Sequence, residues 1–378
     1  MKKSSSGQQR VTHTMRIALL AAAAMAIVPA VARADDALEA VKKEVAAAIA
    51  PVTTWDGPTT GPKGQQGKSV VFVSLTQNSS GNADSARGVE EAAKALGWKF
   101  SLIDGRGTAT GGADALNQAI ALKPDGIVLG SVSIENNKAA LKQAADAGIV
   151  IVGWHATDKP GPIADPKVFT NVSTDPYDIA HMAGLYAVAH SDGKAGAEVI
   201  SDRQYPIVVT KTNGIEDAIK ACSGCALLSE DNGPFGEVPQ RTPALTNALL
   251  QRFGDKLGYM LTFNDVYFDF VVPTLRGAGI DPGKPPYLIS AGDGSVSAYQ
   301  RIRDGKYQIA TVPEPAMMQG WQVADELNRA FAGQPPSGYE TKVHLVTKDN
   351  VDADGGDKNR FEPSNGYRDH YKAIWGVQ

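Results

Sequence analysis

The sequence has 378 residues, of which 43% are hydrophobic and 21% are charged, a balance that is ordinary for a folded globular protein. With 37 basic and 41 acidic side chains the formal net charge is −4, which argues against a nucleic-acid-binding role. The length favours two domains, each large enough to bury a core of its own.

The first 34 residues have the pattern of a secretory signal peptide. A basic start precedes the apolar run 17–30, and Ala32-Arg33-Ala34 has the small-x-small form of a cleavage site. A membrane anchor is the alternative, but the run is shorter than the roughly 20 residues that span a bilayer. Cleavage after Ala34 would remove five basic residues and no acidic one, leaving 32 basic against 41 acidic side chains and a net charge of −9.

Residues 35–67 are predicted to form an N-terminal helical extension outside the main body. Apolar residues recur at helical spacing from Leu38 to Ile49, and a Pro/Gly-rich stretch then leads into the first strand. We expect Trp55 to anchor this stretch.

From residue 68 onward, short apolar runs alternate with amphipathic stretches. The run SVVFVSL at 69–75 is typical of a strand covered on both faces, and the helix after it has Gly97 as its stop. The pattern then predicts strands at 98–104, 125–131, 148–155 and 168–173, and helices at 115–123 and 139–147.

A second series begins with the helix 175–193, which Asp175 can cap. Strands that alternate with helices predict an α/β protein with two similar doubly wound parallel-sheet lobes. In this second series strands are predicted at 197–202, 226–231, 259–265, 287–293 and 308–314, and helices at 215–222, 242–255, 271–275 and 299–302.

Residues 351–378 are polar and turn-rich before a final aromatic stretch, so we expect a C-terminal tail packed on the surface.

The two cysteines form the motif CSGC. In an exported protein Cys222 and Cys225 favour a short structural disulfide, because two ligands cannot close a zinc shell. A redox-active pair is the alternative, since this spacing can lower the pKa of a thiol.

Polar residues collect directly after the predicted strands, where ligands bind in open parallel sheets. An indole such as that of Trp154 offers an apolar face to a sugar or to another ring. Each residue also has a structural explanation: a turn or helix cap for the small polar ones, core packing for Trp154 and His155, and solvation for Lys211. The candidates after the strands are Gln77, Asn78, Ser80, Trp154, His155, Asn264, Asp293 and Glu314, with Lys211 in a following helix.

Enzyme signatures are missing from the sequence. It has no GxSxG elbow, no GxxxxGK[ST] loop and no HExxH, and GRGTATGG does not have the GxGxxG spacing. The six histidines fall in no ligand cluster. We therefore expect no catalytic activity, no metal and no cofactor.

At these strand ends the chain resembles the periplasmic sugar-binding proteins of ABC importers, the type I group that resembles ribose-binding protein. The resemblance covers residues 68–350 and rests on the order of elements and on four segments. These segments are VVFVSLTQNSSGNADSARGVEEAAKALGW, DGIVLGSVSIENNKAALKQAADAGIVIVGWHA, MLTFNDVYFDFVVPTLRGAGI and ISAGDGSVSAYQRIRDGKYQIATVPEPAMMQGWQVADEL.

The resemblance implies a site and a division into lobes. Family members usually have an Asp-Arg pair at the place of Trp154-His155, and aromatics in the first loop. The implied N-terminal lobe is 68–173 plus 315–338 and the C-terminal lobe is 174–314 plus 339–350, joined by a three-strand hinge that closes on ligand. The implied ligand contacts are Asn78, Ser80, Trp154, His155, Lys211, Phe235, Asn264, Asp293 and Glu314.

The resemblance also implies a function. We expect a monomeric periplasmic protein that captures a small polar solute, with a sugar or polyol favoured, and delivers it to an ABC transporter permease in the inner membrane. The departures from the family pattern leave a cyclic amine, a nucleoside-like compound or an aromatic solute open. Two rival functions are a sensor that presents ligand to a receptor kinase and an exported enzyme.

Overall fold

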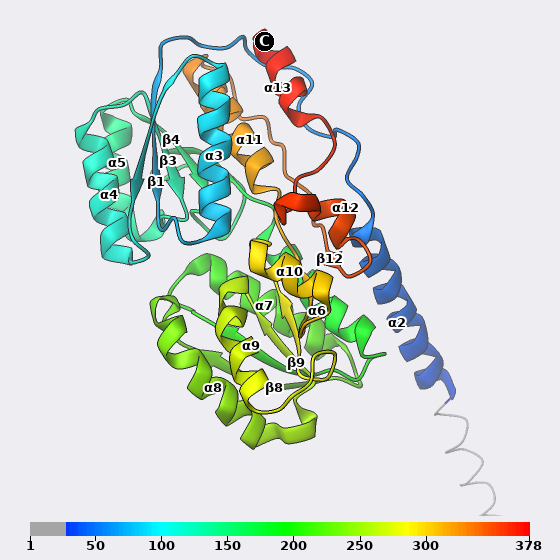
Figure 1. Ribbon diagram of the computed structural model, residues 1–378. Helices are drawn as coiled ribbons and strands as arrows, with labels where there is room; N and C mark the ends of the chain where they lie inside the picture. Colours follow the sequence, from blue (N-terminus) through cyan, green and yellow to red (C-terminus); the bar gives the residue numbers. More distant parts are fainter. Residues whose placement is uncertain (1–27) are drawn as a thin grey trace, which may run out of the picture.

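The computed structural model describes residues 28–378 and contains two lobes, each built on a six-stranded sheet (Figure 1). The first 27 residues, which hold most of the predicted signal peptide, lie outside the described residues. The predicted cleavage position after Ala34 lies within helix α2, which is described from Val28 to Ile49.

The first sheet forms the N lobe and has the strand order β2-β1-β3-β4-β6-β5. All pairings are parallel except that of β5 with β6. Buried Val, Ile and Leu residues fill the central strands, as expected for strands covered on both faces. Its strands are β1 Ser69–Ser74, β2 Lys99–Asp104, β3 Gly126–Gly130, β4 Val150–Trp154, β5 Gly161–Ile163 and β6 Val168–Val172.

Four α-helices flank this sheet. Ser79 and Thr108 cap α3 and α4 through their side chains, while Gly97 follows α3 with a φ of +70° that suits glycine. The fourth helix, α11, comes from far along the sequence and packs against α3 (Figure 1). The helices are α3 Ser80–Ala95, α4 Ala109–Ala121, α5 Lys138–Asp146, preceded by the 3₁₀ turn η1 Glu135–Asn137, and α11 Ala316–Phe331.

The second sheet forms the C lobe, with the order β12-β11-β10-β9-β7-β8, and only β12 runs antiparallel. The predicted alternation of strands and helices is confirmed in both lobes. Strands are β7 Gly196–Ser201, β8 Ala226–Asn232, β9 Tyr259–Thr262, β10 Tyr287–Ser290, β11 Gln308–Thr311 and β12 Val346–Thr347. Helices are α6 Pro176–His190, α7 Pro206–Ala221, α8 Val238–Phe253, α9 Phe268–Gly277 and α10 Val296–Asp304, with the 3₁₀ turns η2 Phe235–Glu237, η3 Gly254–Lys256 and η4 Asp265–Tyr267.

The chain passes between the two sheets three times. We name these passages the first connection (173–175), the second connection (312–315) and the third connection (332–345). They contact one another, since the backbone N–H of Thr174 donates to Glu314 at 2.9 Å and the hydroxyls of Thr174 and Thr341 lie 2.5 Å apart. The first two connections leave from the carboxyl ends of β6 and β11, so these ends of the two sheets lie at the boundary between the lobes (Figure 1).

The N-terminal extension adds a fourth passage. Val45 and Ala48 of α2 pack into the core of the C lobe beside α6. The chain then crosses to the N lobe, where the backbone carbonyl of Thr60 accepts a hydrogen bond from Arg329 and that of Pro62 accepts one from Asn328. Trp55 anchors this stretch by stacking on His370, with ring centroids 5.2 Å apart.

The C-terminal tail makes a fifth passage, again from the C lobe to the N lobe. It consists of α12 Val351–Gly355, the 3₁₀ turn η5 Gly356–Lys358 and α13 Tyr367–Trp375. Helix α12 lies on the C lobe, where Arg303 pairs with Asp352 at 2.6 Å. Helix α13 lies on the N lobe, where Trp375 stacks on Trp321 with centroids 5.5 Å apart and donates to Asp325 at 2.7 Å. The aromatic side chains of α13 are thus buried in the N-lobe core.

Candidate functional site

A cavity lies between the lobes at the carboxyl ends of the strands, where open parallel sheets bind ligands. We call it the central cavity. Its volume is about 90 Å³, which leaves room for several water molecules, since one water needs about 10–15 Å³. The N lobe contributes Leu75, Thr76, Ser79, Asn82, Ser131, Trp154 and His155, and the C lobe contributes Tyr205, Ile207, Val208, Lys211, Phe235, Phe263, Asn264 and Asp293.

The two walls of the central cavity differ in chemistry. The N-lobe wall carries mostly small polar side chains around one indole, whereas the C-lobe wall carries three aromatic rings and two charged groups. Asn82 on the first wall is buried, and its Oδ1 has no hydrogen-bond partner among the described residues.

Trp154 and His155 follow one another at the end of β4 and stack, with ring centroids 3.8 Å apart and planes 9° apart. The backbone of His155 has a φ of +52°, a left-handed conformation that is costly for a residue with a side chain. Ser131, at the end of the neighbouring strand β3, has a φ of +59°. Such backbone strain is concentrated at functional sites.

Glu314 of the second connection lies behind His155. Its Oε1 is 2.8 Å from Nε2 of His155, although the ring N–H is not aligned with that oxygen as a hydrogen bond. Burial alone would raise the pKa of Glu314, but His155, Lys211 and a hydrogen bond from Gln319 outweigh it and lower the pKa to about 2. The carboxylate is therefore ionised throughout the neutral range.

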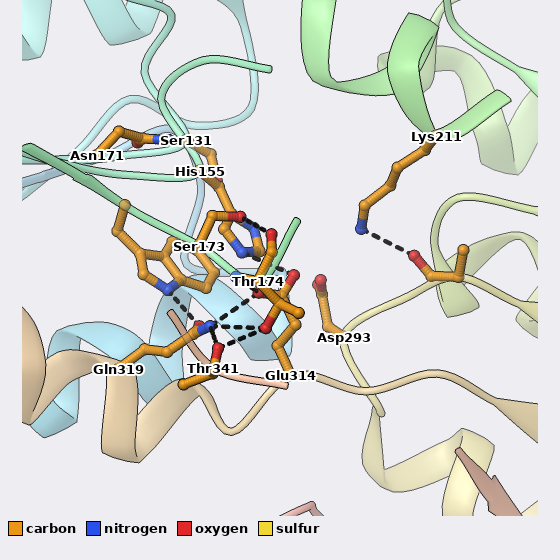
Figure 2. A network of polar contacts seen from close by, with 12 residues as sticks. Ser131, His155, Asn171, Ser173, Thr174, Lys211, Asp293, Glu314, Gln319 and Thr341 are labelled. Atoms are coloured by element: carbon orange, nitrogen blue, oxygen red, sulfur yellow. Dashed lines mark hydrogen bonds and ion pairs between the residues drawn. The ribbon is translucent and has the colours of Figure 1, made fainter. Parts of the chain in front are cut away.

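A buried network of polar side chains surrounds this carboxylate (Figure 2). Oε2 of Glu314 accepts hydrogen bonds from the backbone N–H of Thr174 at 2.9 Å and from Nε2 of Gln319 at 2.8 Å. The same Nε2 lies 2.9 Å from the hydroxyl of Thr341, which in turn lies 2.5 Å from the hydroxyl of Thr174. Trp154 donates its indole N–H to Oε1 of Gln319 at 2.8 Å.

Asp293 lies where the lobes meet. It follows β10 in the C lobe and accepts a hydrogen bond from Nδ2 of Asn264 at 3.1 Å and from the hydroxyl of Ser79, in the N lobe, at 2.7 Å. A Cβ on Gly81 would lie 2.8 Å from Cγ of Asp293, so only glycine allows this approach. One oxygen of Asp293 thus receives donors from both lobes.

Lys211 supplies a positive charge from the C-lobe wall. It lies on α7, is 5% exposed, and donates to the backbone carbonyl of Ala291 at 2.8 Å (Figure 2). An ammonium has three donors, so two remain for a ligand acceptor.

The structure brings six of the predicted residues to the central cavity: Trp154, His155, Lys211, Phe235, Asn264 and Asp293. Glu314 is separated from the cavity by His155 and is not part of its lining. Gln77, Asn78 and Ser80 line a second groove that adjoins the cavity and shares Ser79 and Asn264 with it. The side-chain amide of Gln77 donates to Ser74 of its own lobe, 2.8 Å away.

Several lining residues were not predicted from the sequence. Phe263 directly precedes the predicted Asn264, and Ser79 and Asn82 stand in the same polar run as Asn78, so their strand-end position was the available signal. Ser79 caps α3 and its hydroxyl also donates to Asp293. Ser131 closes the predicted strand 125–131 and carries the same signal, whereas Tyr205 does not.

Away from the cavity, Cys222 and Cys225 form a disulfide bond at the end of α7. Within residues 28–378, no group of three or more side chains is arranged to hold a metal ion. No helix in that range combines the length and the apolar character needed to cross a membrane.

A family model described as periplasmic binding protein domain matches residues 70–335. Among curated proteins, none matches the sequence.

Solved structures share the fold at low sequence identity. A galactofuranose-binding protein is 20% identical with a TM-score of 0.66, and the match covers 76% of this chain and 96% of that one. A solute-binding protein of an ABC transporter from Agrobacterium vitis, with bound allitol, is 18% identical with a TM-score of 0.65, covering 76% and 97%. The arabinose-binding component from Shewanella sp. ANA-3 is 18% identical with a TM-score of 0.66, covering 82% and 99%.

Proposed function

Because this chain belongs to the periplasmic binding protein family, we propose that it captures a small sugar or polyol in the central cavity and delivers it to an ABC transporter permease. The observation that carries this proposal is the meeting of polar groups from both lobes around one cavity. Asn82 and Ser79 come from the N lobe, and Asn264, Asp293 and Lys211 come from the C lobe. A solute that bonds to both walls favours the state in which the lobes are together.

The chemistry of the cavity fits a hydroxylated ligand. The side chain of Asp293 accepts hydrogen bonds from hydroxyls, and hydrogen bonds to a carboxylate are stronger than neutral ones. Lys211 donates to ring or hydroxyl oxygens, and the face of an aromatic ring packs against the C–H side of a sugar. The structural neighbours with allitol or arabinofuranose bound support this solute class.

Export to the periplasm is part of the proposal. The first 34 residues have the pattern of a signal peptide, and the matching family is periplasmic. We propose that the mature protein acts as a monomer and that the permease recognises the state with the lobes together. The family consists of binding proteins, and we propose no catalytic role for this chain.

The aromatic side chains of the C-lobe wall favour a second class of solute. Tyr205, Phe235 and Phe263 line that wall together, and Asp293 can pair with an amine. A nucleoside or a cyclic amine with a flat ring would fit these groups. The same panel of compounds tests both classes.

Thermal unfolding in the presence of single compounds tests the function. The panel consists of D-galactose, D-glucose, L-arabinose, D-ribose, allitol, adenosine and piperidine. A compound present at 100 times its dissociation constant adds about 2.7 kcal/mol of stability and raises Tm by several degrees. We expect a sugar or allitol to raise Tm, and no shift in an Asn264→Ala/Asp293→Ala double variant. If only adenosine or piperidine raises Tm, the ligand belongs to the second class of solute and not to the sugars. A rise in Tm that persists in the double variant would contradict binding in the central cavity.

A further inference from the structure

We propose that Gln319, which lies outside the central cavity, is the positioning residue that holds Trp154 and Glu314 in place for ligand binding. This inference rests on the proposed function, because it concerns the same site. Gln319 is in the first turn of α11 and is fully buried. It touches the cavity only through the side chains that it holds.

The hydrogen-bonding chemistry explains why an amide is needed at this position. An indole N–H is only a donor and an ionised carboxylate is only an acceptor, so one group between them must offer both functions. Oε1 of Gln319 accepts from Trp154 at 2.8 Å, and Nε2 donates to Glu314 at 2.8 Å. These partners also determine which way the amide faces.

The same amide joins the three connections between the lobes. Gln319 follows the second connection, which contains Glu314; Nε2 reaches Thr341 of the third connection at 2.9 Å and lies 3.4 Å from Thr174 of the first. Glu314 in turn lies against His155, the next residue of the cavity wall. A change at Gln319 therefore reaches Trp154 directly and His155 through Glu314.

The helix provides a matched control one turn away. Gln322 is also buried on α11, and its Nε2 donates to the backbone carbonyl of Tyr339 in the third connection at 2.7 Å. It contacts neither Trp154 nor Glu314 through any hydrogen bond of the structure. Gln319→Leu and Gln322→Leu each remove one buried amide that is hydrogen-bonded to the third connection. Only Gln319→Leu also removes the hydrogen bonds to Trp154 and Glu314.

The first experiment compares these two variants in Tm and in affinity for whichever named sugar or polyol raises the wild-type Tm most. We expect both variants to lose stability, and only Gln319→Leu to lose affinity, by at least tenfold. Equal affinities in the two variants would overturn the inference. Absence of any shift in the wild-type protein would contradict the proposed function instead, and the second experiment tests the inference without a bound compound.

The second experiment uses Gln319→Glu. A protonated carboxylic acid can still accept from the indole and donate to Glu314, as the amide does, whereas its ionised form has no donor and repels Glu314. The charged or titratable groups facing this position are Glu314, His155 and Lys211. They are present in every variant, so the wild-type pH profile serves as the reference.

The readout is the indole N–H resonance of Trp154, identified by its absence from a Trp154→Phe variant. We expect this resonance to keep its wild-type pH profile in Gln322→Leu and to gain a titration between pH 4 and 8 in Gln319→Glu. Affinity in Gln319→Glu should be near the wild-type value at pH 5 and at least tenfold weaker at pH 8. A Trp154 resonance in Gln319→Glu that follows the wild-type profile throughout would overturn the inference.

Discussion

The hydroxyl of Ser79 lies 2.7 Å from Oδ2 of Asp293, and these two residues belong to different lobes. Ser79 is also the N-cap of α3, so the N-terminal end of this N-lobe helix contacts the C lobe. Asn264 donates to the same carboxylate oxygen from its own lobe. The carboxylate of Asp293 is thus the point at which both walls of the central cavity share one acceptor.

Replacement of Asp293 by Asn is expected to weaken sugar or polyol binding by 10- to 100-fold, because a charge-assisted acceptor becomes a neutral amide. Isothermal titration measures this change. Asp304→Asn is the control, since Asp304 pairs with Lys306 on the exposed end of α10 and lies away from the cavity. Equal losses of affinity in the two variants would show that Asp293 does not bind the ligand.

Replacement of Trp154 by Phe removes the donor to Gln319 and leaves Oε1 of that amide buried without a partner. An unpaired buried polar atom costs about 1–3 kcal/mol, so chemical denaturation should show a loss of stability of this size. Affinity for the same sugar should fall as well, because the ring no longer has a fixed orientation. A variant with unchanged stability would mean that the indole hydrogen bond contributes little.

The C-terminal tail is expected to stabilise the N lobe. Trp375 is 1% exposed and stacks on Trp321, so Trp375→Ala should cost about 3–5 kcal/mol in free energy of unfolding. Leu122→Ala is the control, because Leu122 is 62% exposed and its truncation should change stability by less than about 0.5 kcal/mol. Denaturant titration separates the two outcomes. A loss below about 1 kcal/mol in Trp375→Ala would show that the tail is not part of the folded core.

Stability is expected to fall as pH rises from about 4.5 to 7. Burial, only partly offset by a hydrogen bond from Ser229, raises the pKa of Glu198 from 4.5 to about 7, and Oε1 of this carboxyl has no partner among the described residues. The folded state therefore binds the proton more tightly than the unfolded state. The stability that this proton provides is lost across the window, by about 3 kcal/mol for one such group.

Glu198→Gln should reduce this loss, and unfolding free energies measured at pH 4.5 and pH 7.5 test it. Burial also raises the pKa of Glu326 to about 7, so part of the loss should remain in the variant. Glu230→Gln, on the neighbouring strand, should instead lower stability at pH 7.5, since Glu230 is paired with Arg203 at 2.6 Å and its pKa is lowered by that pair. An unchanged pH slope in Glu198→Gln would contradict the assignment.

The alternation of strands and helices was predictable because apolar runs and amphipathic stretches follow one another along the chain. The strand-end argument also placed Trp154, Asn264 and Asp293 together, because the carboxyl ends of parallel strands lie at one edge of a sheet. The strand-end argument was least accurate for the polar loop that follows β1. Side chains there point either to the central cavity, as Ser79 does, or to the adjoining groove, as Ser80 does.

Two features could not be read from local patterns. Gln319 is separated from Trp154 by 165 positions and lies within a helix, so no strand end points to it. Glu314 does follow a strand, but only the fold shows that His155, Thr174 and Gln319 already occupy its oxygens. The paths of the N-terminal extension and the C-terminal tail also depend on contacts between distant segments, such as that of Arg303 with Asp352.

The most direct test of the central claim is isothermal titration of the panel compounds into the wild-type protein and into the Asn264→Ala/Asp293→Ala variant. We predict that a sugar or allitol binds the wild-type chain at one molecule per chain, and that the double variant binds it at least 100-fold more weakly. Binding of equal strength in both proteins, or no heat from any sugar or polyol with the wild-type chain, would contradict capture of such a solute between the two walls.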